Sequence, residues 1–144
     1  GVYYSTGKYE QARDMYEGLV ADDEDALAAK NNLAMIYAEN LSFPENLAKA
    51  RALAADLQDS DNPAFLDTVG WVMYMNGDYE QAITYSLAAV DKVGTSTLLQ
   101  YHLGMAYYKS GDLEKAKTHL ELATQTPDIR YPGLEEAQAT LQQL

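Results

Sequence analysis

The residues of this chain that could carry chemistry are few, and their spacing does not assemble a reactive site. The sequence contains two histidines, His102 and His119, which lie far apart, and it contains no cysteine. A zinc site needs several closely spaced histidine or cysteine ligands, so we expect no bound metal ion. The chain also lacks a Ser/His/Asp or Cys/His arrangement, a phosphate-binding glycine loop and a dinucleotide-binding motif. We therefore expect no catalytic residues and no cofactor.

Two acidic stretches, residues 22–25 and 59–62, could be taken for calcium ligands. The first lacks the ligand spacing and the glycine of a calcium loop, and the second has Gly70 where a bidentate glutamate would be needed. Capping and dipole compensation explain the first stretch better, at the start of a helix that begins near Asp25. The second stretch leads into Pro63, which we expect to open the next helix.

The charge of the chain narrows the classes of partner. Its 144 residues include 22 acidic and 10 basic ones, which gives a formal net charge of −12. Nucleic acid and anionic membrane surfaces would be repelled, so we expect neither nucleic-acid binding nor direct membrane contact from this segment. The charge is explained first by solubility, and an attraction to basic partners is the alternative.

The helices that position these residues can be predicted from an internal repeat. Residues 62–90 have a near-copy in residues 95–123, and the matching positions lie 34 residues apart. A small residue would let two helices cross closely, a left-handed glycine would end the first helix, and an aspartate would cap the second. The recurring positions are Gly70 and Gly104, Gly77-Asp78 and Gly111-Asp112, and Ala82 and Ala116.

This combination resembles the tetratricopeptide repeat family. The resemblance implies an all-α fold: a right-handed α-α superhelix, or solenoid, of helix-turn-helix repeats that ends in a capping helix. The whole chain, residues 1–144, would form one domain. Its expected units are a partial repeat at 1–24, full repeats at 25–62, 63–96 and 97–130, and a capping helix at 132–144.

Helices are expected at about residues 8–20, 25–39, 45–58, 63–75, 79–92, 95–109, 113–124 and 133–144. Gly7 aligns with Gly77, so residues 2–6 should be the tail of a first helix that ends there. Further repeats are expected upstream. Repeat 25–62 carries extra residues around Pro44, which suits a loop or a first helical turn.

In the family, the first helices of successive repeats line a concave groove. Carried over to this sequence, the groove positions offer aromatic and methionine side chains, which suit adaptable packing against a partner. Trp71, the only tryptophan, falls at such a position, and whether it faces the groove or packs inside the protein stays open. The expected partner-binding residues are Met35, Trp71, Tyr74, Met75, Leu98, Tyr101, Met105 and Tyr108.

One subclass of the family binds a peptide's C-terminal carboxylate with lysine, arginine and asparagine. The corresponding places here hold Asn31, Met35, Thr68, Leu98 and His102. Only Asn31 and His102 could donate a hydrogen bond there, and neither carries a fixed positive charge. Binding of a terminal carboxylate is therefore not expected.

The resemblance implies a non-enzymatic scaffold that binds a peptide or helix of a partner protein in the concave groove. Two alternatives stay open. The chain could self-associate as a homo-oligomer through an apolar edge of the N-terminal repeat at Tyr3, Tyr4, Tyr9 and Tyr16, or it could be a regulatory segment of a larger multidomain protein. Residues 31–34 and 62–71 look like those of long bacterial proteins of this family, some tied to the cell envelope. Cytoplasmic and periplasmic locations both stay open.

Overall fold

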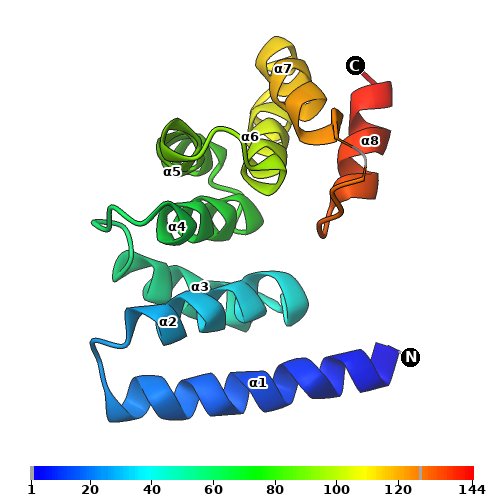
Figure 1. Cartoon of the computed structure of the whole chain (residues 1–144). Coiled ribbons are helices and arrows are strands. Elements are labelled where there is room, and N and C mark those ends of the chain that lie inside the picture. Colours follow the sequence, from blue (N-terminus) through cyan, green and yellow to red (C-terminus); the bar gives the residue numbers. More distant parts are fainter. Residues whose placement is uncertain (1, 127) are drawn as a thin grey trace.

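The protein is a stack of helices, which a computed structural model describes for residues 2–126 and 128–144 (Figure 1). The helices follow one another through the stack in chain order, from α1 at one end to α7 and α8 at the other. None of the described helices is long and apolar enough to cross a membrane. Their bounds are α1 (Val2–Asp22), α2 (Leu27–Met35) continued by a π-helical turn η1 (Ile36–Asn40), α3 (Pro44–Ala55), α4 (Pro63–Met75), α5 (Tyr79–Lys92), α6 (Thr97–Ser110), α7 (Leu113–Thr124) and α8 (Leu134–Gln142).

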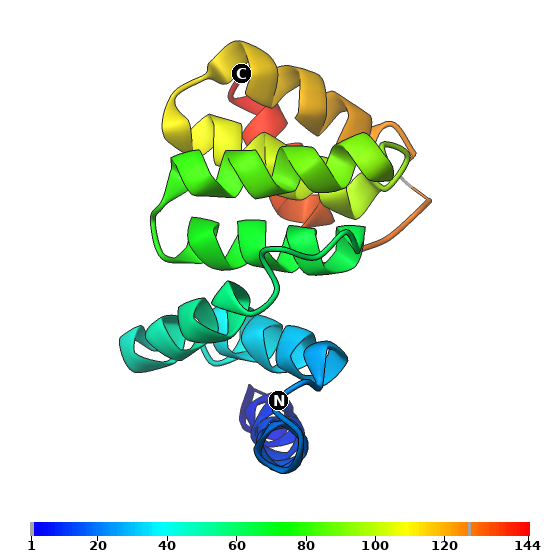
Figure 2. The same ribbon diagram turned by 90° about the vertical axis from the view of Figure 1, so that its left-hand side faces the viewer.

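The helices pair as antiparallel hairpins, α2 with α3, α4 with α5 and α6 with α7, and each hairpin packs on the next. Figure 2 shows the hairpins one above another, with α1 seen nearly end-on at the far end from the C-terminus. The core therefore runs along the stack between neighbouring hairpins, as repeat architectures require. The expected all-α solenoid is confirmed.

The predicted turn chemistry is confirmed in the two regular hairpins. Gly77 and Gly111 have φ values of 82° and 95°, which a glycine adopts without a Cβ clash. The carboxylate of Asp78 then accepts from the backbone N–H of Gln81, and Asp112 caps α7 in the same way. Each helix pair is thus closed by a stop residue followed directly by a start residue.

The predicted close crossing of the paired helices at Gly70 and Gly104 is also confirmed. A Cβ on Gly70 would lie 2.5 Å from Oγ of Ser86 in α5, and 3.2 Å from the backbone oxygen of Ala82. A Cβ on Gly104 would lie 2.8 Å from Cγ of Leu120 in α7. At these two points any side chain would push the paired helices apart.

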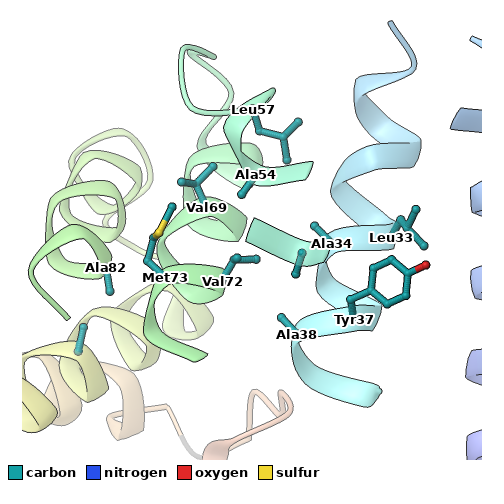
Figure 3. Packing of buried hydrophobic residues seen from close by; sticks show 12 residues of the cluster. Leu33, Ala34, Tyr37, Ala38, Ala54, Leu57, Val69, Val72, Met73 and Ala82 are labelled. Atoms are coloured by element: carbon teal, nitrogen blue, oxygen red, sulfur yellow. The ribbon is translucent and has the colours of Figure 1, made fainter. Parts of the chain in front are cut away.

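The largest apolar cluster joins the first two hairpins (Figure 3). Small residues of α2 and η1, Ala34 and Ala38, lie opposite Val69 and Val72 of α4, and all four side chains are fully buried. Alanines let the helices approach while the branched valines fill the space between them. This cluster fixes the position of α2 against α4, whose other sides contribute to the candidate site.

The N-terminal prediction is wrong, because α1 runs unbroken through Gly7. Gly7 is absent from the residues with positive φ, and a helix can continue through a glycine at a cost of about 1 kcal/mol. The physical difference lies in the next residue. Gly7 is followed by Lys8, whereas Gly77 is followed by the capping residue Asp78, so nothing at Gly7 starts a new helix.

The acidic run at residues 22–25 does not cap α2, which corrects a second expectation. Asp22 is the last residue of α1, and the N-cap of α2 is Ala26, whose side chain makes no capping bond. Instead, Asp23 accepts a hydrogen bond of 2.9 Å from the backbone N–H of Asp25. The run therefore builds the turn between the helices. The extra residues before Pro44 form the π-helical turn η1 and a short loop, and Pro44 opens α3.

Candidate protein-binding surface

The residues predicted to bind a partner lie together in the structure. Every predicted partner-binding residue belongs to a single apolar cluster formed by α2, α4 and α6 and by the C-terminal part of the chain. We call this set the aromatic–methionine cluster. It comprises Met35, Trp71, Tyr74, Met75, Leu98, Tyr101, Met105 and Tyr108, packed with Leu120, Ala123, Tyr131, Ala137, Leu141 and Leu144.

The centre of this cluster is closed, which differs from an open groove lined by its residues. Trp71 is 4% exposed, and Tyr101 and Met105 are each 2% exposed. The other predicted residues are half-buried around them. The open question about Trp71 is thereby answered for the free chain, because the indole packs inside the protein. As contacts to a partner, the predicted residues remain a prediction, and their half-buried members form the accessible rim.

Helix α8 and the segment before it cover Tyr101. A Cβ on Gly133 would lie 2.4 Å from the Tyr101 ring, so only a glycine fits over it. The Tyr101 hydroxyl donates a 3.0 Å hydrogen bond to Glu136 of α8, and Tyr131 donates one of 2.7 Å to the backbone oxygen of Ala123. A helix position that was expected to line a groove is thus used here to dock the next helix.

A buried polar pair, which the sequence did not single out, links α4 to α6. His102 is 1% exposed, and its Nδ1 donates a 2.7 Å hydrogen bond to Asp67. The two residues lie 35 positions apart, one more than the repeat spacing, so they belong to neighbouring first helices. This offset is the feature of the sequence from which the pair could have been predicted. The pair also occupies His102, which removes one of the two donors considered for a terminal carboxylate.

Aromatic rings surround this pair. The Trp71 ring stacks on the Tyr74 ring, with centroids 4.4 Å apart and planes 7° apart. It also stacks on the His102 ring, with centroids 4.1 Å apart. Tyr101 packs at a tilt against Trp71, with centroids 5.6 Å apart. Ring contacts of this kind add to the energy of burial and hold the indole in one orientation. The cluster is therefore a preorganised set of rings.

Carboxylates border the rings. Glu39 of η1 and Glu136 of α8 are both exposed. Partial burial of the carboxyl is the main cause that raises the pKa of Glu39 above its ordinary value. The interaction with His102 lowers this pKa, and the charges of Asp67 and Glu136 raise it. Burial, followed by the charge of Glu136, also raises the pKa of Tyr101 and of Tyr74. The border of the cluster therefore carries a negative electrostatic potential.

Two buried polar side-chain atoms have no hydrogen-bond partner among the described residues. They are Nε1 of Trp71, a donor, and Oδ1 of Asn31, an acceptor. Buried polar groups are nearly always hydrogen-bonded, so each of these two atoms needs an explanation. Asn31 and Trp71 both fall on first helices, in α2 and α4. In the described part of the chain there is no group of three His, Asp or Glu side chains that could hold a metal ion.

A second apolar surface lies at the other end of the stack. Residues of α1 and of the start of α2, among them Tyr16, Leu19 and Leu27, line an open cleft with a volume of about 520 Å³. Met15 and Leu19 are 55% and 48% exposed. Of the edge predicted for self-association, Tyr9 is exposed and Tyr16 packs against the core, and the side chains of Tyr3 and Tyr4 lie outside the described residues.

The antiparallel hairpins, stacked in chain order around close glycine crossings, place this chain in the class of helical-repeat proteins. Models of the tetratricopeptide repeat match residues 2–64, 63–90 and 99–126. The chain belongs to the tetratricopeptide repeat family, whose members are scaffolds for protein–protein interaction.

Among solved structures, the crystal structure of MamA is similar to this chain. The two share 18% sequence identity with a TM-score of 0.71, over 96% of this chain and 77% of that chain. At this identity the likeness concerns the fold alone. No curated protein sequence matches the chain.

Proposed function

We propose that this chain binds a peptide or helix of another protein at the rim of the aromatic–methionine cluster. The carrying observation is that the residues predicted for binding are gathered at one place on the first helices, with half-buried Met35, Tyr74, Met75, Leu98 and Tyr108 around a closed centre. Methionine and aromatic side chains give large contact areas and adapt to a partner's shape. Such a rim can add a partner's apolar side chains without unfolding the centre.

The experiment begins with a displayed library of random peptides selected on the whole chain. Binding of each selected peptide is then followed by the fluorescence of Trp71, the only tryptophan, which lies at the centre of the cluster. Leu98→Ser and Met35→Ser should weaken binding several-fold, because each removes apolar contact area from the rim. Leu113→Ser, on the exposed face of α7, is the matched control and should leave binding unchanged. Equal binding by all three variants would refute the proposal.

Self-association through α1 is the second candidate. It is favoured by the exposed apolar side chains of Met15 and Leu19 on α1, of which Leu19 lines the cleft between α1 and α2. In that case the mass measured by light scattering should rise with protein concentration. Met15→Ser together with Leu19→Ser should return the chain to a monomer, while Leu113→Ser should not. A monomer at all concentrations would exclude this candidate for the chain.

A further inference from the structure

The carboxylates at the border of the cluster lack cationic partners. Among the described residues, the Lys and Arg ion pairs include Arg13–Asp14, Lys30–Asp56, Arg51–Asp78 and Lys115–Asp112. None of them involves Glu39 or Glu136. The side chain of Glu39 also accepts no hydrogen bond in the described structure, and the side chain of Glu136 accepts only the bond from Tyr101. The border of the cluster thus presents two exposed carboxylates with no lysine or arginine of the described structure paired to them, and a cationic side chain of a ligand could pair with both.

These carboxylates and the rings form one environment. The carboxylate of Glu136 interacts electrostatically with Glu39, Tyr74 and Tyr101, and the carboxylate of Glu39 interacts in the same way with Tyr101. Glu136 is attached to the cluster through the hydroxyl of Tyr101. The residues come from η1, α4, α6 and α8, so the fold brings them together from four separate elements. This is a different situation from an acidic run on one exposed loop, such as residues 22–25.

The indole of Trp71 supplies an independent observation. It lies among Tyr74, Tyr101 and His102, is 4% exposed, and its Nε1 has no acceptor. A buried donor without an acceptor costs free energy, and an oxygen of a ligand bonded to it would restore that energy. Carboxylates, aromatic faces and an unused donor in one place complement a peptide segment that carries a positive charge and backbone carbonyl groups.

From this complementarity we infer that the rim of the aromatic–methionine cluster binds a basic segment of a partner protein, with a lysine or arginine side chain placed between Glu39, Glu136 and the face of Tyr74. The inference rests on the proposed function and specifies the chemistry of the partner. The cation would pair with both carboxylates and lie against the ring, and the partner's main chain would offer an oxygen to Trp71. A partner whose contact residues are apolar only, or acidic, would leave Glu39 unpaired in the complex.

The test uses the peptides selected from the random display library on the whole chain. Lysine and arginine should be enriched among the selected sequences relative to the unselected library. Replacing the basic residue of a selected peptide by glutamine should weaken binding, and replacing it by glutamate should abolish it. Glu39→Gln and Glu136→Gln should each weaken binding of the basic peptide by roughly fivefold, the upper range for an exposed ion pair.

Two controls separate local pairing from the attraction of an acidic protein for any cation. Glu114→Gln changes the net charge equally, but on α7 and away from the cluster, and should change binding by less than about 1.5-fold. A glutamine variant of the peptide should bind equally to the parent chain and to Glu39→Gln. A loss of the same size with Glu114→Gln would overturn the inference, because the attraction would then be nonspecific.

The outcomes also distinguish this inference from the proposed function. Selected peptides that respond to Leu98→Ser but carry no basic residue, or that ignore Glu39→Gln and Glu136→Gln, would overturn the inference and leave the binding function standing. A library that yields no peptide responding to Leu98→Ser or Met35→Ser would overturn both. Basic peptides that respond to both sets of variants would support both.

Discussion

The same substitution, glycine to alanine inside a helix, should have opposite effects at Gly70 and at Gly18. Alanine is favoured over glycine in a helix interior by about 1 kcal/mol. Gly18 lies in the interior of α1, and a Cβ there would meet no atom within 4 Å. Gly18→Ala should therefore stabilise the chain by about 1 kcal/mol, since only the propensity term changes.

At Gly70 the packing term is larger than the propensity term. The new Cβ would lie 2.5 Å from Oγ of Ser86, 3.0 Å from the backbone nitrogen of Ser86 and 3.2 Å from the backbone oxygen of Ala82. The hydroxyl could rotate, but the two backbone atoms can move only if α5 moves. Overpacking of this kind costs about 1–3 kcal/mol, and the rigid contacts favour the upper end. After the propensity gain, Gly70→Ala should destabilise the hairpin by about 2 kcal/mol.

Urea unfolding gives the measurement, with circular dichroism for the whole chain and the fluorescence of Trp71, the neighbour of Gly70 in α4, for this hairpin. Two probes are needed because repeat arrays do not always unfold in one step. Ser86→Ala in the Gly70→Ala background removes the hydroxyl contact and leaves the backbone contacts, so only part of the loss should return. If Gly70→Ala and Gly18→Ala shifted the midpoint in the same direction, the close-crossing argument would be refuted.

Three further results are expected. Gly111→Ala should destabilise the chain by about 1 kcal/mol in urea unfolding, because φ is 95° there and a Cβ is strained in that region. Tyr37→Phe removes the hydrogen bond from its hydroxyl to Glu17 and should cost about 1–2 kcal/mol, seen as faster amide exchange in α1. Glu39→Gln should raise the stability at pH 7. The raised pKa of Glu39 means that its favourable contribution is present below its ordinary pKa of 4.5 and is lost as the pH rises, so the gain should vanish in unfolding curves measured below pH 4.5.

The bounds of three helices could be predicted because their ends carry specific chemistry. Helix α4 begins at Pro63, and α5 and α7 begin directly after a left-handed glycine and a capping aspartate, Gly77-Asp78 and Gly111-Asp112. Gly7 has the glycine of this signal without the aspartate, and α1 continues through it. The family offset alone was therefore insufficient at the N-terminus, where the residue after the glycine decided between a turn and a longer helix.

Membership of the candidate site was predictable, but its burial was not. The resemblance to the family placed Trp71, Tyr101 and Met105 on the groove-lining face of the first helices, and the structure brings them together in one cluster. Their exposure depends on what the next element does. Tyr101 is covered because Gly133 lets the chain pass directly over its ring and places α8 against it. The pairing of Asp67 with His102 likewise depends on how the first helices of neighbouring repeats align, and a pattern of residue types along the sequence does not specify that alignment.

A single substitution, Glu39→Gln, separates a structural role from a binding role at the candidate surface. If a residue is needed for folding, substituting it should lower both the stability of the chain and its binding of a partner. The Glu39 side chain has no ion-pair or hydrogen-bond partner in the described structure, and burial, with the charges of Asp67 and Glu136, raises the pKa of its carboxyl although His102 lowers it, so its charge opposes folding. Removing that charge should stabilise the free chain and weaken a basic ligand at once. A gain in stability with unchanged binding would mean that the carboxylate is merely tolerated, and a loss of stability would mean that its environment is more favourable than its contacts indicate.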